Sequence, residues 1–173
     1  MPITAFIVRV AEAEPLVQNL RSRFDATASL GVPAHITVLV PFMPPTRITP
    51  EVLAAATEAF ASVRAFNFSL NEVCRWPETT YLSALPARPF VELTEAIVRR
   101  FPAFPPYAGK HSEIVPHLTV ADGSRNAAEV AEAELRNLLQ KMGMVRGRCH
   151  EIELLENSEG RWRTMHTIPL PQK

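Results

Sequence analysis

The chain has 173 residues, of which 47% are hydrophobic and 21% are charged, and its formal net charge is zero. This composition is typical of one folded domain of ordinary size and excludes a disordered chain. Proteins that bind long nucleic acid usually present a strongly basic face, so a long duplex is not expected as a partner. A short oligonucleotide or a mononucleotide is still possible as a ligand. No run approaches the roughly 18 apolar residues of a membrane span, and the first residues carry no basic leader. We therefore expect a cytoplasmic protein without membrane contact.

In the first half of the chain, predicted strands and helices alternate. Apolar and β-branched runs predict strands at residues 3–10, 35–42, 66–76 and 79–85. Apolar residues at four-residue spacing predict a helix over 13–28. Thr49 followed by Pro50 has the pattern of an N-cap and first helical position, which predicts a second helix to about residue 63.

The second half repeats this alternation. It predicts a helix over 90–101, a long loop over 102–115, a strand over 117–121, a helix over 126–142 and a hairpin of strands 149–156 and 161–168. Neighbouring hairpins favour antiparallel pairing and therefore an α+β fold. The sequence predicts a single domain over 1–173 with two similar lobes, at about 1–87 and 88–173.

One tetrapeptide pattern occurs once in each half. His35-Ile36-Thr37-Val38 and His117-Leu118-Thr119-Val120 both read His, aliphatic, Thr, Val. Residues i and i+2 of a strand point to the same side, so each His is expected to share a face with its Thr, while the aliphatic residue faces the core. Two such strands side by side would form a polar site with two imidazoles and two hydroxyls.

This set of groups suits phosphodiester chemistry. A neutral histidine can take a proton from an attacking hydroxyl or water, and a protonated histidine can give one to the leaving oxygen. The two threonine hydroxyls can bind the phosphate, on whose oxygens charge grows during displacement. Displacement at a cyclic phosphate by such a set needs no metal and no cofactor. Because the two motifs look alike, the sequence does not distinguish the acid from the base.

The paired motif resembles the two-histidine (2H) phosphoesterases, which include the 2′-5′ RNA ligase-like proteins and the cyclic phosphodiesterases. The resemblance implies two pseudo-symmetric lobes, each a small mainly antiparallel sheet with helices on its outer face, and an active cleft between them. It implies that His35 and His117 are catalytic and that Thr37 and Thr119 bind phosphate. The implied reaction is metal-independent hydrolysis of 2′,3′-cyclic phosphate ends of nucleotides or RNA, or transfer to a 5′-hydroxyl. Separately from the resemblance, we expect a monomer.

One departure from the family pattern follows the second motif. Where the family usually has a larger aliphatic residue two positions after the second threonine, this chain has Ala121, followed by Asp122. The change affects packing below the strand and leaves the polar pair of the motif intact.

Five further residues are candidates for substrate contact. Phe42 could stack on a base or pack in the core, and Trp76 and Tyr81 flank a turn near the expected cleft. Tyr107 and Lys110 lie in the long loop before the second motif, which has the length and composition of a lid. Lys110 could pair with phosphate or be solvated.

Two alternatives stay open at this point. The chain could be a non-catalytic nucleotide or RNA-end binding module that keeps the site without turnover. The two histidines could instead hold a metal, but only Asp122 lies near either motif, and the two cysteines, Cys74 and Cys149, have no metal-ligand spacing.

Overall fold

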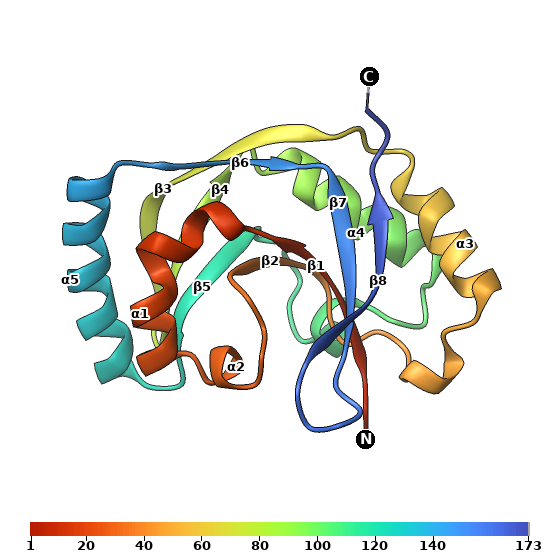
Figure 1. The fold of residues 1–173 in the computed structure, drawn as a ribbon, viewed down its shortest axis with the longest axis horizontal. Coiled ribbons are helices and arrows are strands. Elements are labelled where there is room, and N and C mark those ends of the chain that lie inside the picture. The colour runs from red at the N-terminus through yellow and green to blue at the C-terminus, as the bar shows by residue number, and fades with distance from the viewer. Residues whose placement is uncertain (173) are drawn as a thin grey trace.

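Eight strands form two antiparallel sheets in the computed structural model, which describes residues 1–172 (Figure 1). The first sheet has the order β2 (His35–Leu39), β1 (Thr4–Arg9), β7 (Glu151–Glu156), β8 (Arg163–Pro169). The second has the order β5 (His117–Asp122), β4 (Thr79–Leu85), β3 (Phe66–Trp76), β6 (Val145–Cys149). This arrangement confirms the predicted α+β class and antiparallel pairing.

Five α-helices and three short 3-10 turns complete the described chain. The helices are α1 (Glu14–Phe24), α2 (Ala26–Ser29), α3 (Pro50–Phe60), α4 (Arg88–Arg100) and α5 (Arg125–Met142). The 3-10 turns are η1 (Ala11–Ala13), η2 (Pro45–Arg47) and η3 (Pro106–Gly109). The predicted cap of α3 is confirmed, since the Thr49 side chain accepts a hydrogen bond from the Val52 N–H.

The single helix expected over 13–28 is interrupted at Asp25. This residue adopts an extended backbone and its carboxylate accepts a hydrogen bond from the Thr27 N–H, which caps α2. An aspartate competes with helical hydrogen bonding by binding nearby backbone groups, so the chain stops one helix and starts a second there.

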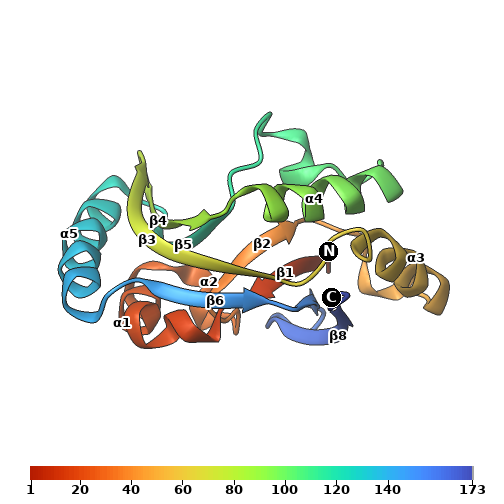
Figure 2. The same cartoon turned by 90° about the horizontal axis from the view of Figure 1, so that it is seen from above.

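The two sheets do not divide at residue 87. Each sheet takes strands from both halves of the sequence, and β6, which lies apart from the predicted hairpin β7–β8, pairs with β3. Only His150 separates β6 from β7, so one nearly continuous extended segment passes from the second sheet into the first (Figures 1 and 2). Local sequence patterns predict strands well, but the choice of partner depends on which edges the tertiary fold brings together.

One apolar core lies on the buried faces of both sheets. It includes Phe6 from β1, Ile36 from β2, Leu82 from β4, Leu118 from β5 and Ile152 from β7. Helices α1 and α5 lie side by side against the second sheet, and α4 packs on β2 (Figure 2). The opposite faces of the two motif strands are therefore left to polar side chains.

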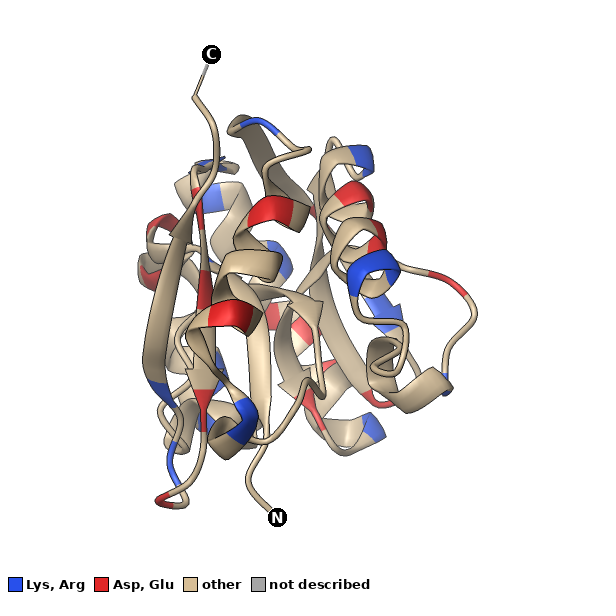
Figure 3. Ribbon diagram, turned by 90° about the vertical axis from the view of Figure 1, so that its right-hand side faces the viewer, with Lys and Arg blue, Asp and Glu red and all other residues tan. Residues whose placement is uncertain are grey.

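Basic and acidic residues are interspersed on the side of the molecule that faces the viewer in Figure 3, and the formal net charge of the chain is zero. No helix within residues 1–172 has the length and apolar character needed to cross a membrane.

Candidate active site

The two motif strands alternate as the sequence predicts. In β2, His35 and Thr37 are partly exposed while Ile36 and Val38 are buried. In β5 the corresponding pattern repeats, with a partly exposed histidine and threonine and a buried leucine and valine. Each histidine therefore shares an accessible face with its threonine, because side chains two apart on a strand point the same way.

The fold brings the two motifs together at the edges of the sheets. Strand β2 is an edge of the first sheet, β5 is an edge of the second, and these two edges pack against each other. The imidazoles are close enough for a charge on His117 to lower the pKa of His35. We refer to His35, Thr37, His117 and Thr119 as the two-histidine site.

Both imidazoles are anchored in the same way. The Nδ1–H of His35 donates to the Pro33 carbonyl at 2.8 Å, and the Nδ1–H of His117 donates to the Val115 carbonyl at 2.6 Å. A carbonyl oxygen can only accept, so in each neutral ring the proton sits on Nδ1 and the lone pair sits on Nε2. Each Nε2 can then accept a proton, and in the imidazolium form it can donate one.

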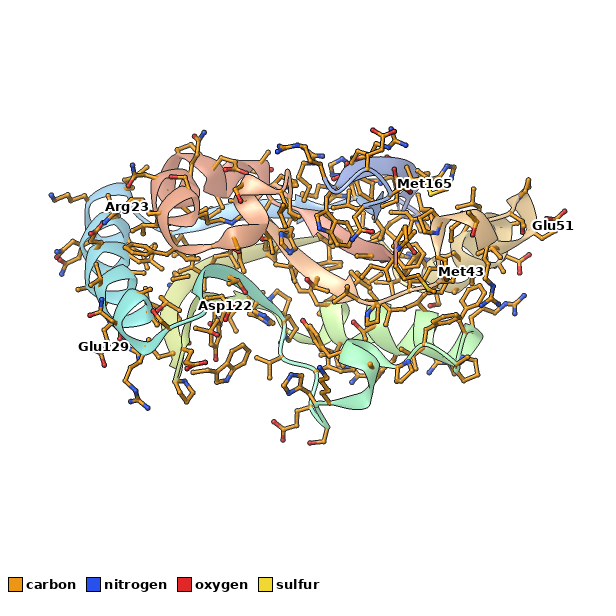
Figure 4. The ribbon with its side chains drawn as sticks, turned by 90° about the horizontal axis from the view of Figure 1, so that it is seen from below. Arg23, Met43, Glu51, Asp122, Glu129 and Met165 are labelled. Atoms are coloured by element: carbon orange, nitrogen blue, oxygen red, sulfur yellow. The ribbon has the colours of Figure 1, made fainter. Side chains whose placement is uncertain are left out.

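Burial is the main influence on the pKa of both imidazoles, and different charged residues lie near each. Burial lowers the pKa of His35 to about 4, an effect that the nearby Arg21 guanidinium reinforces and the hydrogen bond to Pro33 opposes. Burial also lowers the pKa of His117, but the hydrogen bond to Val115 and the Asp122 carboxylate oppose that shift. Asp122 ends β5 (Figure 4), where it accepts a hydrogen bond from the Thr79 hydroxyl at 2.6 Å.

A buried ion pair behind His35 was not predicted from the sequence. Arg21 and Asp25 are both nearly inaccessible, and their side chains meet at 3.1 Å. Arg21 also donates to the Val32 carbonyl at 3.0 Å, just before the residue that anchors His35. The four-residue spacing of Arg21 and Asp25 is visible in the sequence, but the same spacing also describes exposed helical pairs, so spacing alone gives no sign of burial.

Trp76 and Tyr81 lie beside His117. The Trp76 and Tyr81 rings are 4.2 Å apart between centroids, and the Trp76 ring stands edge-on to the His117 ring at 4.9 Å. Tyr81 also pairs in register with Thr119 across β4 and β5. The structure thus places both aromatic candidates next to one half of the two-histidine site.

The loop before β5 contacts both motifs. The Tyr107 N–H donates to the Val40 carbonyl at 2.6 Å. Burial raises the pKa of the Tyr107 phenol, and a hydrogen-bonding interaction with the Thr37 side chain opposes part of that rise. Tyr107 and Ala108 both adopt left-handed backbone angles, with φ of 51° and 54°, which is uncommon for residues other than glycine. Lys110 is exposed in the same loop.

A cavity of about 160 Å³ lies under this loop. Its lining includes Thr37, Thr94, Tyr107, His111 and Pro116. Larger, more open depressions occur on the surface beside β3, but their linings contain none of the four residues of the two-histidine site. The candidate site is therefore located by its chemistry and not by the size of a hollow.

The structure removes Phe42 from the list of candidate substrate contacts. Its side chain is 2% exposed, and its ring packs against Phe6, Phe101 and Phe104 at centroid distances of 4.9, 5.2 and 5.1 Å. A ring enclosed in this way has no free face for a base, so we assign Phe42 to the core. The residue follows a polar motif on the sequence, but the chain turns it inward after β2 ends.

The described residues include no cluster of typical metal ligands. Within the part of the chain that the structure describes, no group of three or more His, Cys, Asp or Glu side chains is arranged to hold a metal ion. Cys74 and Cys149 are free thiols, and burial raises the pKa of Cys149 to about 12.

The sequence matches a family model, that of the 2′-5′ RNA ligase superfamily, over residues 9–161. This match covers most of the chain, which therefore belongs to that superfamily of 2H phosphoesterases, as the paired motif indicates. Family and fold together support a phosphoesterase activity. A comparison with curated protein sequences found no match.

Solved structures share the fold at low sequence identity. The apo crystal structure of E. coli LigT is 16% identical, with 99% of each chain covered and a TM-score of 0.59. E. coli LigT complexed with 3′-AMP is 17% identical, with the same coverage and a TM-score of 0.58. The protein TT0787 of Thermus thermophilus is 15% identical, again with 99% of each chain covered, and has a TM-score of 0.60.

Proposed function

We propose that this protein is a metal-independent phosphodiesterase that hydrolyses 2′,3′-cyclic phosphate ends of nucleotides or short RNA. The observation that carries the proposal is the matched anchoring of His35 and His117, each with Nδ1 held by a backbone carbonyl and Nε2 left for proton transfer. The two rings lie on packed strand edges, each beside a threonine hydroxyl. Together these groups supply a general acid, a general base and hydrogen-bond donors to the phosphate, without a metal.

The proposed reaction is an in-line displacement at phosphorus. One histidine accepts a proton from water at its Nε2 as the water oxygen bonds to phosphorus. The bond between phosphorus and one ribose oxygen then breaks, and that oxygen takes a proton from the Nε2 of the other histidine. The product is a nucleoside monophosphate end, and Thr37 and Thr119 donate hydrogen bonds to the phosphate oxygens as their negative charge grows.

A similar solved protein has been crystallised with nucleotides, which supports a nucleotide-sized substrate for this chain. E. coli LigT has been solved in complex with 3′-AMP, with ATP and with NADP+. We extend nucleotide binding to this chain as part of the proposal. Transfer to a 5′-hydroxyl is the same chemistry with an alcohol in place of water, and the absence of net positive charge favours small substrates over long RNA.

The test is turnover of a panel of nucleoside 2′,3′-cyclic phosphates and short RNAs with cyclic phosphate ends, in excess chelator. We expect turnover by the wild-type protein, and a loss of at least about 100-fold in both His35→Ala and His117→Ala. Full activity in either variant would contradict the paired mechanism. Saturable binding without turnover of any substrate would instead identify a binding module.

A further inference from the structure

Trp76 is an exposed aromatic residue held firmly beside a reactive group. Trp76 is 38% exposed, whereas Tyr81 is only 8% exposed; the two rings pack in a tilted arrangement, with centroids 4.2 Å apart and an interplanar angle of 34°. The Tyr81 ring packs against the indole, and more than a third of Trp76 remains in contact with solvent. A large apolar ring left open to solvent next to a candidate catalytic centre is more informative than scattered surface residues.

The aromatic pair lies on one side of the two-histidine site. Trp76 and Tyr81 stand edge-on to His117, with centroid distances of 4.9 and 5.4 Å and interplanar angles of 80° and 68°. No aromatic ring pair found in residues 1–172 includes His35; its partner across β1 and β2 is Arg9, held by Glu153 at 2.7 Å. The site is therefore pseudo-symmetric in its histidines and asymmetric in what surrounds them.

A supported indole suits a nucleobase in particular. Every base offers a π-face, and stacking on an aromatic side chain contributes to binding without requiring a sequence. In a nucleoside cyclic phosphate, one ribose joins the base to the phosphate, so a base on Trp76 places its own ribose next to His117. An in-line displacement then puts the attacking water on the opposite side of phosphorus, toward His35.

We propose that Trp76, supported by Tyr81, is the nucleobase platform of this site, so that the substrate is a nucleoside 2′,3′-cyclic phosphate with His117 protonating the departing ribose oxygen and His35 deprotonating water. The inference rests on the proposed function for its chemistry. The proximity of Trp76 and Tyr81 to His117 carries this assignment, and the electrostatic surroundings add to it only in part. Burial lowers the pKa of both imidazoles. At His35 the Arg21 guanidinium adds to that shift and Asp25 opposes it, whereas at His117 the Asp122 carboxylate opposes the shift and His111 adds to it.

Binding is tested first, because it does not depend on turnover. The chain has two tryptophans, and Trp162 packs with Ile7, Val32 and Leu155 in a separate cluster, so Trp162→Phe leaves Trp76 as the single tryptophan fluorophore. We expect adenosine 2′-monophosphate and 3′-monophosphate to quench its emission, and inorganic phosphate to leave it unchanged. Equal responses to the nucleotides and to phosphate, or no response to either, would overturn the platform.

Turnover then separates stacking from support of His117. We expect Trp76→Ala to raise KM for adenosine 2′,3′-cyclic phosphate by roughly 10- to 100-fold, with a smaller effect in Trp76→Phe. The same variant should leave kcat/KM for a base-free methyl riboside 2,3-cyclic phosphate within about threefold of the wild-type value. Equal losses on both substrates would assign Trp76 to holding His117 and overturn the base platform.

A separate substrate tests which histidine protonates the leaving oxygen. In a cyclic phosphate whose bridging ribose oxygen is replaced by sulfur, the leaving thiolate needs no proton, and both the 2′- and the 3′-thio isomers would be tried. We expect His117→Ala to recover activity on one of them while His35→Ala does not. Recovery in His35→Ala instead would reverse the assignment. If the wild-type protein turned over no cyclic phosphate, the proposed function would fail, and the fluorescence titration would still decide on the platform.

Discussion

The guanidinium of Arg21 donates to the backbone carbonyl of Val32 at 3.0 Å. Arg21 lies at the end of α1 and is 3% exposed, and Val32 stands one residue before Pro33, whose carbonyl holds the His35 ring. The ion pair with Asp25 satisfies the rest of this buried charge. Arg21 therefore links a helix end to the segment that positions the first histidine.

Replacing Arg21 is expected to destabilise the fold. Arg21→Met leaves Asp25 as an uncompensated buried charge, which costs about 3–5 kcal/mol of the free energy of unfolding. Chemical denaturation measures this change, and Arg23→Met is the control, because Arg23 lies on the same helix in an exposed pair with Glu134 at 2.8 Å. An exposed pair contributes only about 0–1 kcal/mol. Similar losses in the two variants would show that burial of the Arg21 pair contributes nothing extra.

Activity is expected to peak on the acidic side of neutrality. The reactive free enzyme has one histidine neutral and the other protonated, and the pH profile of kcat/KM reports their pKa values in the free enzyme. With the pKa of His35 lowered to about 4 and that of His117 lowered from 6.5, activity should rise as pH increases through about 4 and fall before pH 6.5. Because the two imidazoles interact, the two apparent pKa values of the pH profile describe the pair and not either histidine alone. An optimum above pH 7 would contradict the lowered pKa values.

Stability should follow the same titration. The pKa of His35 is lower in the folded chain than in the unfolded chain, so between about pH 6.5 and 4 the unfolded state binds more protons. The contribution of this residue to stability is therefore fully present above pH 6.5 and declines as pH falls toward 4. Denaturation of His35→Gln across this range should show a weaker loss of stability on acidification than the wild-type protein. Parallel curves for the two proteins would mean that the His35 pKa is not lowered by folding.

Removing either threonine hydroxyl should weaken phosphate binding without unfolding the protein. A hydrogen bond to a charged group contributes about 1.5–3 kcal/mol, so Thr37→Val and Thr119→Val should each lower kcat/KM by roughly 10- to 100-fold. Valine keeps the branched shape that a strand favours. Thr46→Val is the matched control, since Thr46 is exposed in η2 outside the two-histidine site. Steady-state kinetics that showed the same modest change in all three variants would argue against a phosphate role.

Gly147 in β6 leaves room for an aromatic ring of the core. A Cβ at this position would lie 2.6 Å from the Phe68 Cζ, closer than real contacts allow. Gly147→Ala should therefore force the ring to shift and cost about 1–3 kcal/mol of stability, as overpacking typically does. Arg146→Ala, an exposed neighbour on the same strand, is expected to change stability by less than about 0.5 kcal/mol. Thermal or chemical unfolding compares the two, and a neutral Gly147→Ala would show that the ring has space to move.

Local signals in the sequence predicted most elements of the fold. The strand over 79–85, the cap at Thr49 and the end of α5 near Gly143 all follow from residue type and spacing. The break at Asp25 and the separate strand β6 were not predicted, since an aspartate can cap or sit in a helix and β6 carries glycine and two arginines. These elements depend on contacts that are distant in the sequence.

By itself, the sequence determined that His35 and Thr37, like His117 and Thr119, share an accessible face, because the period of a strand is two and the intervening aliphatic residues must be buried. Only the tertiary structure decided that the two strands meet as packed sheet edges, that Trp76 and Tyr81 stand against His117, and that Phe42 belongs to the core. The reason is physical: periodicity sets the direction of a side chain within its own strand, whereas its neighbours depend on which edges pair and which faces pack together.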